Sequence, residues 1–348
     1  MDLSDLDRRC GEWLRGEGTS AHVVISSRVR LARNLAGYPF ATRAEEDQRQ
    51  EITLRMREEL TGIALGPRQF WVDLDDAEKL DSRFLVERHL ISRELESGRG
   101  PRGVAFGSDE ILSVMINEED HVRIQSIRAG LALEEAWQRA LQVDHELEKR
   151  LEFAASNKFG YLTACPTNVG TGLRASVMLH LPALVHLKQI EKVFHAASRT
   201  GLTVRGFYGE GTMASGDLYQ ISNQVTLGHT EEEILQSLRT MLPRILEYEE
   251  MCRAELASRG QLKLEDKVHR ALAILRSART LTSEEAMQYL SAVRLGHVMA
   301  ILKDVDVSSL NELFVLTQPA HLQKLEGRPL DPDERDVRRA AFVRSTLA

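Results

Sequence analysis

The chain has 348 residues, of which 43% are hydrophobic and 28% are charged, so it is long enough for two domains with a substantial core. Its formal net charge of -7 argues against a general binder of nucleic acid or of anionic membranes. Three widely spaced cysteines, Cys10, Cys165 and Cys252, form neither a disulfide framework nor a zinc motif, which favours a reducing compartment. The acidic N-terminus lacks the apolar core of a signal peptide and no apolar run could span a membrane, so we expect a cytoplasmic protein.

The first half of the chain mixes strand and helix patterns without the regular alternation of a doubly wound fold, which indicates an α+β fold. Apolar runs predict strands at residues 23–25, 69–74, 111–116 and 122–127, the last two paired across an acidic turn. Helices are predicted at residues 42–60, 75–87 and 133–151. Thr42 and Glu45 have the spacing of a capping box for the first helix. The glycines of residues 97–107 indicate a mobile surface loop.

The second half changes character near Thr230, where the strand patterns stop. Before it, strands are predicted at residues 159–164, 175–181, 204–208 and 218–225, and a helix at residues 182–201. After it, helices are predicted at residues 230–258 (with a kink at Pro243), 264–278, 283–302, 310–318 and 332–346. We place a boundary near residue 255, which divides the chain into an α+β domain, residues 1–255, and an all-helical domain, residues 256–348.

A polar loop between two predicted strands, Cys165–Val177, combines several groups that could contact a ligand. Gly170 and Gly172 let backbone amides approach a ligand closely, and Cys165 and Arg174 add a thiol and a fixed positive charge. An ordinary connection between strands is the alternative interpretation.

Five arginines, each on or beside a predicted strand and near a flexible loop, are candidates for holding phosphate groups: Arg28, Arg30, Arg123, Arg174 and Arg205. The sequence has neither a Walker phosphate loop nor a dinucleotide fingerprint after a strand, so a bound nucleotide would need other phosphate ligands. Guanidinium groups pair bidentately with phosphate oxygens, and converging arginines would repel each other unless a polyanion neutralised them. Taken singly, each arginine is more typical of a surface salt bridge, and it is their common setting beside strands and loops that favours a phosphate site.

Three carboxylates, Glu118, Glu119 and Glu210, are candidates for gripping a cation, either a metal ion or a guanidinium group. A carboxylate binds guanidinium as a bidentate fork and can accept its proton. A solvated turn is the alternative for Glu118 and Glu119, and an inert core residue is the alternative for Cys165.

Five segments, in the same order along the chain, resemble the signatures of the phosphagen (guanidino) kinases, the family of the creatine and arginine kinases. They read SSRVR from Ser26, NEEDHVR from Asn117, CPTNVGT from Cys165, LRASV from Leu173 and RGFYGE from Arg205. The resemblance implies a catalytic domain with a largely antiparallel sheet flanked by helices.

The position of the helical domain indicates which group of these kinases the chain resembles. Kinases of small guanidino compounds carry a helical domain before the Ser26 segment, whereas this chain carries one at its C-terminal end, as the bacterial protein arginine kinases do. Arg335, Asp336 and Arg339 resemble the phosphoarginine pocket of that family, and on a helix they share one face. The resemblance implies that the helical domain serves homodimerisation and phosphoarginine binding.

The resemblance also implies roles for individual residues. The ATP-binding residues would be Ser26, Ser27, Arg28, Val29, Arg30, His89, Arg123, Arg174, Ala175, Ser176, Val177, Met178, Arg205, Gly206, Phe207, Tyr208, Gly209 and Glu210. Glu119 and Glu210 would clamp the guanidinium, with either serving as the base, and Cys165 would touch a guanidinium nitrogen. Glu118 would orient Mg²⁺ through water, with no protein ligand bound to the ion directly.

These features predict a Mg²⁺- and ATP-dependent protein-arginine kinase. The resemblance further implies a stress-response role: marking proteins for a Clp-type protease, regulating a heat-shock transcription repressor, and activation by a zinc-finger protein. Two alternatives remain open, a kinase of a small free guanidino compound and a phosphoarginine-reading protease adaptor.

Overall fold

The computed structural model describes residue 6, residues 10–206 and residues 215–348 of the chain. Within these residues, eight strands form one antiparallel sheet in the order β2-β3-β4-β5-β1-β8-β10-β9. The strands are β1 (Val24–Arg33), β2 (Gln69–Asp73), β3 (Gly103–Gly107), β4 (Leu112–Ile116), β5 (Val122–Ala129), β8 (Leu173–His180), β9 (Leu202–Gly206) and β10 (Leu218–Asn223). A separate two-stranded hairpin pairs β6 (Ala155–Ser156) with β7 (Gly160–Tyr161).

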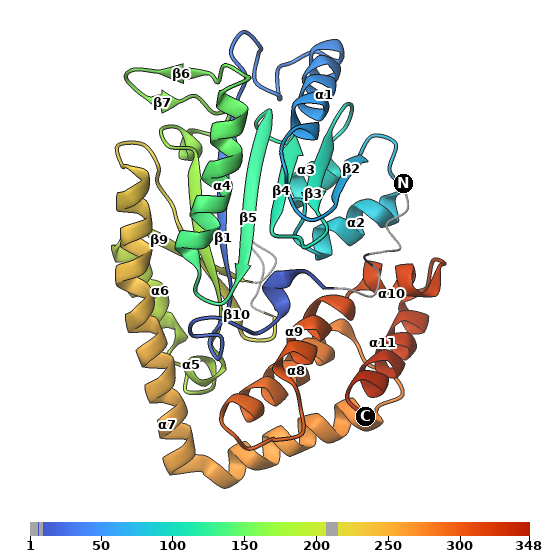
Figure 1. Ribbon diagram of the computed structural model, residues 1–348. Helices are drawn as coiled ribbons and strands as arrows, with labels where there is room; N and C mark the ends of the chain where they lie inside the picture. Colours follow the sequence, from blue (N-terminus) through green and yellow to red (C-terminus); the bar gives the residue numbers. More distant parts are fainter. Residues whose placement is uncertain (1–5, 7–9, 207–214) are drawn as a thin grey trace.

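Helices cover the sheet and then form the C-terminal part of the molecule (Figure 1). Along the sheet lie α1 (Glu46–Thr61), α2 (Lys79–Glu87), α3 (Arg93–Ser97), α4 (Leu133–Glu148), α5 (Pro182–His186) and α6 (Ile190–Arg199), with short 3₁₀ helices at Glu12–Leu14 and Pro166–Asn168. The C-terminal helices are α7 (Glu231–Ser277), α8 (Ser283–Val298), α9 (Val307–Leu316), α10 (Pro319–Glu326) and α11 (Pro332–Thr346). The predicted α+β class with a helical C-terminal region is confirmed. No helix in the described ranges is both long and apolar enough to cross a membrane.

The central strand β1 alternates between the core and a polar face. In β1, Val29 and Leu31 are fully buried and belong to the same core cluster as Ala136 and Ala140 of α4. The intervening arginines therefore project from the opposite face, because successive side chains of a strand point to opposite sides.

Several predicted elements differ from the observed ones. Residues 103–107, predicted as part of a mobile loop, form the fully buried strand β3. Its glycines serve close packing rather than mobility: a Cβ atom on Gly107 would lie 2.3 Å from the Leu65 carbonyl oxygen, and one on Gly103 would lie 2.8 Å from the Trp71 ring.

Helix boundaries also differ. Glu45 and Gln48, rather than Thr42 and Glu45, form the capping box of α1. The helix predicted from 182 to 201 is interrupted at Lys188, which has a left-handed φ of 55° and separates α5 from α6. α7 (Glu231–Ser277) is kinked at Gly260, whose backbone is non-helical, so the predicted break between the helices 230–258 and 264–278 is confirmed, whereas the kink expected at Pro243 is found at Gly260 instead. The division at residue 255 falls inside this helix and stays a prediction.

The C-terminal helices are joined to the sheet by buried charged groups. Arg294 of α8 is fully buried and contacts His180 at the end of β8, 2.8 Å from its Nδ1. Glu87 at the end of α2 accepts hydrogen bonds from the first backbone amides of α10 and lies 2.8 Å from the His321 ring. The neighbouring Arg88, also buried, pairs with Glu110. Because an unpaired buried charge is costly, these contacts fix α8 and α10 against the sheet.

Candidate active site

The strand register places the candidate arginines on one face of the sheet. Arg30 lies directly opposite Arg174 across β1 and β8, and Ala32 lies opposite Arg123 across β1 and β5. On the other side, Gln220 of β10 pairs with both Met178 of β8 and Arg205 of β9. Directly opposed residues and residues two apart on a strand share a face, so all five arginines project to the same side.

This face forms the floor of a cavity of about 500 Å³. The candidates that line it are Arg28, Arg30, His89, Glu118, Glu119, Arg123, Cys165, Arg174 and Arg205. The remaining lining residues include Thr42, Ser92, Arg93, Glu94, Thr167, Asn168, Gly172 and Gln220. Groups that are up to 177 residues apart in the sequence (205 − 28 = 177) are thus brought to one site.

The arginine cluster is electrostatically strained. Burial lowers the pKa of Arg28 to about 10, with further lowering by the nearby charges of Arg174 and Arg123. Burial, followed by Arg28, Arg123 and Arg174, also lowers the pKa of Arg30 well below its usual value. Arg28 donates a 2.8 Å hydrogen bond to Gln220, but Arg30 has no hydrogen-bond partner within the described residues and its Nε is buried. An anion with several oxygens would relieve both the repulsion and the missing hydrogen bonds.

The acidic hairpin between β4 and β5 faces the arginines. Glu118 is fully buried and accepts hydrogen bonds from Arg123, at 2.6 Å, and from the Ser92 hydroxyl. The side chain of Glu119 is 38% exposed, and its Oε2 lies 3.4 Å from Arg123 Nη2. Partial burial raises the pKa of Glu119, partly offset by Arg123 and also by a hydrogen bond with the Cys165 thiol. Glu119 and Cys165 therefore sit side by side at the cavity wall.

A network that the sequence did not reveal holds this hairpin against the Cys165 loop. Asp120 is fully buried, and its Oδ1 accepts 2.7 Å hydrogen bonds from Asn34 Nδ2 and from the Ala164 amide. Asn34 in turn accepts a hydrogen bond from the His121 amide. Asp120 follows the two glutamates for which a solvated turn is the alternative interpretation, and the sequence signal for its role is its place between Glu119 and a predicted strand.

His89 occupies a constrained position at the cavity edge. Its backbone φ of 59° is left-handed, and its carbonyl accepts a 2.7 Å hydrogen bond from Gln125. The ring meets Trp13 edge to face at 5.3 Å between centroids. Burial, followed by Arg28, Arg93 and Arg30, lowers the pKa of His89 to about 3, so its imidazole is neutral near pH 7. Left-handed non-glycine residues persist only where surrounding contacts hold them, and they gather at functional sites.

Other residues of the predicted nucleotide motifs lie beside the cavity rather than in it. Ser26, Ser176 and Met178 line a small recess next to Arg28 and His89. Ser27, Val29, Ala175 and Val177 are fully buried. The Ser27 hydroxyl serves the backbone, since it donates to the Gly130 carbonyl and accepts from the Ala132 amide, both at 2.9 Å. Gly206 ends β9, and Phe207, Tyr208, Gly209 and Glu210 lie outside the described residues.

The C-terminal candidates Arg335, Asp336 and Arg339 lie together on α11. Arg339 is buried and donates to the carbonyls of Thr317 and Leu281 at 2.8 and 2.7 Å, and to the Asp336 carboxylate. Its guanidinium thus joins α11 to the start of α8 and the end of α9. Arg335 is partly exposed, so it is the more accessible of the two arginines.

No group of three or more His, Cys, Asp or Glu side chains among the described residues could hold a metal ion. The chemistry of the cavity is that of a phosphate site next to a guanidinium site: clustered arginines on one side, and a carboxylate with a neighbouring thiol on the other.

Known proteins resemble this chain over both regions. Residues 51–252 match the family described as ATP:guanido phosphotransferase, C-terminal catalytic domain, and residues 261–348 match the protein-arginine kinase McsB C-terminal domain. A protein named protein-arginine kinase from Halothermothrix orenii is 48% identical over 100% of this chain and 99% of its own length. One of the same name from Symbiobacterium thermophilum is 48% identical over 99% and 98%.

Solved structures share the fold. The duplicated taurocyamine kinase from Schistosoma mansoni, with bound transition state analog components, matches with a TM-score of 0.61 and 24% identity. The match covers 79% of this chain and 41% of that one. Lombricine kinase matches with a TM-score of 0.60 and 26% identity, over 71% of this chain and 72% of its own.

Proposed function

Because the chain belongs to the ATP:guanido phosphotransferase family, as one of its protein-arginine kinases, we propose that its arginine-lined cavity binds the phosphates of ATP and that the adjoining acidic hairpin binds the target arginine. The observation that carries the proposal is the row of five arginines on one sheet face, ending beside Glu119 and Cys165. The enzyme then transfers the γ-phosphoryl group of ATP to an arginine side chain of a protein.

The phosphate half of the reaction rests on charge and geometry. The strands hold the guanidinium groups in place, so these groups can bind the phosphoryl oxygens without rearranging. Charge that is positioned in advance in this way lowers the activation barrier. Mg²⁺, when bound with ATP, neutralises part of the phosphate charge. The donor set fits an ion carried by the nucleotide rather than by the protein, since Glu118 Oε1 is engaged with Arg123 and Ser92. Glu118 would contact the ion through water.

The guanidinium half needs a group that orients a planar cation and accepts a proton. An arginine side chain is protonated, with a pKa above about 12, and is a poor nucleophile in that form. Glu119 can bind two guanidinium nitrogens and take a proton as the N–P bond forms and the bond to the ADP oxygen breaks. Glu210 would provide the second carboxylate, with either residue as the base, and the Cys165 thiol would contact a guanidinium nitrogen.

The decisive experiment is incubation with MgATP and an unfolded, arginine-rich protein, followed by mass spectrometry for acid-labile phosphoarginine. Glu119→Ala is expected to reduce transfer by about 100-fold or more, the usual range for losing a positioned acid–base group, while ATP affinity stays within about two-fold. Glu210→Ala is expected to behave alike, and Glu58→Ala, on the exposed side of α1, is the matched control. Retention of most of the rate by Glu119→Ala would refute the assignment. Comparing free arginine with the protein substrate separates a small-guanidino kinase from a protein kinase.

We further propose that Arg335, Asp336 and Arg339 form a phosphoarginine pocket in the helical C-terminal domain, supported by their placement on one helix with Arg335 partly exposed. Arg335→Ala should weaken phosphoarginine binding in calorimetry and leave basal transfer unchanged. Equal binding by both proteins would contradict it.

The cellular role is proposed from the family alone: a cytoplasmic, homodimeric stress-response enzyme that marks proteins for a Clp-type protease and regulates a heat-shock repressor, with a zinc-finger activator. Light scattering tests the dimer. Phosphorylation of the purified repressor, with and without the activator, tests the regulation.

A further inference from the structure

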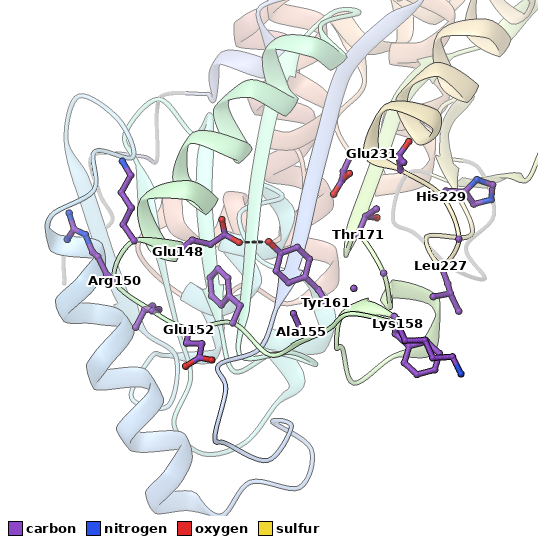
Figure 2. A pocket seen from close by; sticks show the side chains of 18 residues that line it. Glu148, Arg150, Glu152, Ala155, Lys158, Tyr161, Thr171, Leu227, His229 and Glu231 are labelled. Carbon is purple, nitrogen blue, oxygen red and sulfur yellow. Dashed lines mark hydrogen bonds between the residues drawn. The ribbon is translucent and has the colours of Figure 1, made fainter.

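A groove of about 870 Å³ borders the same Cys165–Val177 loop that lines the catalytic cavity, and Gly170 and Thr171 of this loop line the groove (Figure 2). Its walls come from the end of α4, from the β6–β7 hairpin, from Gly170 and Thr171, and from residues 227–231 at the start of α7. None of the residues assigned to catalysis or to nucleotide binding lines it.

Backbone contacts connect the groove to the catalytic loop. Gly160 (φ 72°) and Gly170 (φ 111°) have left-handed backbones, and a Cβ atom on Gly160 would lie 2.6 Å from the Gly170 carbonyl oxygen. A Cβ atom on Gly170 would lie 3.1 Å from the Leu227 Cα. Thr226 donates hydrogen bonds to the carbonyls of Thr167 and Val169, at 2.9 and 2.7 Å. The hairpin, the catalytic loop and the segment before α7 therefore form one ledge.

Apolar side chains are exposed along this ledge. Phe159 is 42% exposed and Leu227 is 46% exposed, on either side of the stacked glycines, and Val225 nearby is 48% exposed. In Figure 2, Leu227 and Lys158 stand at one end of the groove and Tyr161 lies between them and Glu148. A cluster of exposed large apolar side chains beside an active site indicates an interaction surface.

The charges of the groove favour a basic occupant. Lys149 pairs with Glu146, Arg150 lies 3.7 Å from Glu59, and Lys158 lies over the Phe159 ring. The side chains of Glu152 and Glu231, by contrast, make no hydrogen bond or ion pair with any described residue. Lys149 and Arg150 thus have carboxylate partners within the protein, and the carboxylates of Glu152 and Glu231 remain for a ligand.

We propose that this groove binds the substrate polypeptide beside its target arginine, taking one apolar side chain against Phe159 and Leu227 and a neighbouring basic residue near Glu152 or Glu231. The proposal rests on the proposed function, because the arginine must enter the cavity at Cys165. Five residues of chain separate Cys165 from Gly170 (170 − 165 = 5), which is at most roughly 18 Å. The apolar residue therefore lies within about five positions of the arginine, as an extended peptide covers a similar length.

Two peptides test the proposal with the full-length enzyme. Both contain one arginine within Gly and Ser residues, and only one carries a leucine or phenylalanine three to five positions away, scanned on both sides. For wild type, kcat/KM is expected to be about ten-fold higher with the best apolar peptide, the gain typical of burying an apolar side chain. Leu227→Ser and Phe159→Ser should each remove that advantage and leave the Gly/Ser peptide unchanged. Leu262→Ser, 79% exposed on the second half of α7, is the matched control.

The outcomes separate the two proposals. Equal efficiency of wild type with all peptides, or equal slowing of both peptides by Leu227→Ser, would overturn the groove and leave the kinase assignment standing. A change in oligomeric state of Leu227→Ser without a change in peptide preference would assign the surface to a second copy of the chain instead. If wild type phosphorylated no peptide or protein, the proposed function would fail first, and the groove with it.

Discussion

Replacing Arg30 by methionine is expected to stabilise the ligand-free protein while abolishing its response to ATP. Arg30 is a suitable position because it makes no hydrogen bond to any described residue, so its removal leaves no polar partner unsatisfied. It lies directly opposite Arg174 in the sheet, and its pKa is lowered by burial and then by Arg28, Arg123 and Arg174. Methionine keeps the unbranched apolar stem and removes the charge.

The size of the expected stabilisation follows from the repulsion between Arg30 and its neighbouring arginines. At an effective dielectric constant of about 20 and a separation of about 8 Å, two unit positive charges repel by about 2 kcal/mol. Arg30 has three arginine neighbours, partly offset by Glu118 and by salt. After this screening we expect the free energy of unfolding to rise by about 1–3 kcal/mol, comparable with other replacements of buried charges by apolar residues. The corresponding rise in Tm is about 1–4 °C for a protein of this size.

The assay is thermal and urea unfolding of wild type and Arg30→Met at low and high salt, with and without MgATP. At 100 times Kd, a ligand stabilises the folded state by about 2.7 kcal/mol, and the variant should lose most of that gain. Salt should stabilise wild type more than the variant, because it screens the repulsion. Arg139→Met, at an exposed position of α4, is the control and should change stability by less than about 0.5 kcal/mol.

Two results would refute the reasoning. A ligand-free Arg30→Met protein less stable than wild type, with an unchanged urea m-value, would mean that Arg30 is held by favourable contacts rather than strained. An ATP-induced stabilisation equal to that of wild type would mean that the arginine face does not bind the phosphates.

Three further predictions concern the residues around the cavity. A base must be ionised to accept a proton, so with Glu119 as the base kcat/KM for the arginine substrate should fall as the pH drops through the raised pKa of Glu119 in the free enzyme, giving an acid limb above the usual range of a glutamate; a pH-independent kcat/KM across pH 5–7 would contradict this role. Asp120→Ala should lower kcat at least ten-fold with little change in ATP affinity, because the substitution removes the hydrogen bond that holds the Ala164 amide beside the Cys165 loop. It should also destabilise the protein by about 2–5 kcal/mol, because two buried donors lose their acceptor. An unchanged kcat would show that the network is only structural. His321→Gln should raise the KM for ATP more than it changes kcat, since its ring contacts the residues that precede the constrained His89 turn; equal effects on both parameters, or on Tm alone, would exclude a positioning role.

The sequence predicted which arginines share a face of the sheet because the relevant patterns are local. Arginines at alternate positions of β1 must share a face in any extended segment, and an acidic turn between two alternating apolar runs must be the tip of a hairpin. The sequence was wrong about β3, because the same glycines can mark a mobile loop or a tightly packed strand, and only the backbone of Leu65 and the ring of Trp71 distinguish the two.

The sequence could not predict which charged side chains are buried. Nothing in the sequence indicates that Asp120 and Arg339 are buried, yet Asp120 accepts a hydrogen bond from the Ala164 amide and Arg339 joins three helices through backbone carbonyls. Each depends on acceptors or donors that are distant in the chain, and no local pattern specifies them.

The sequence by itself determined the chemical inventory: which strands carry guanidinium groups, which turn carries the carboxylates, that a thiol precedes a glycine-containing loop, and that the C-terminal region is helical. Only the tertiary structure decided which of these groups meet. The antiparallel pairing placed β5, β1, β8, β10 and β9 in that order, so that the arginines of β5, β1, β8 and β9 form one cationic floor, and the packing of Gly160 on Gly170 built a groove along the same loop. The physical reason is that side-chain periodicity is a local property, whereas register, burial and close backbone approach are settled by contacts between segments far apart in the chain.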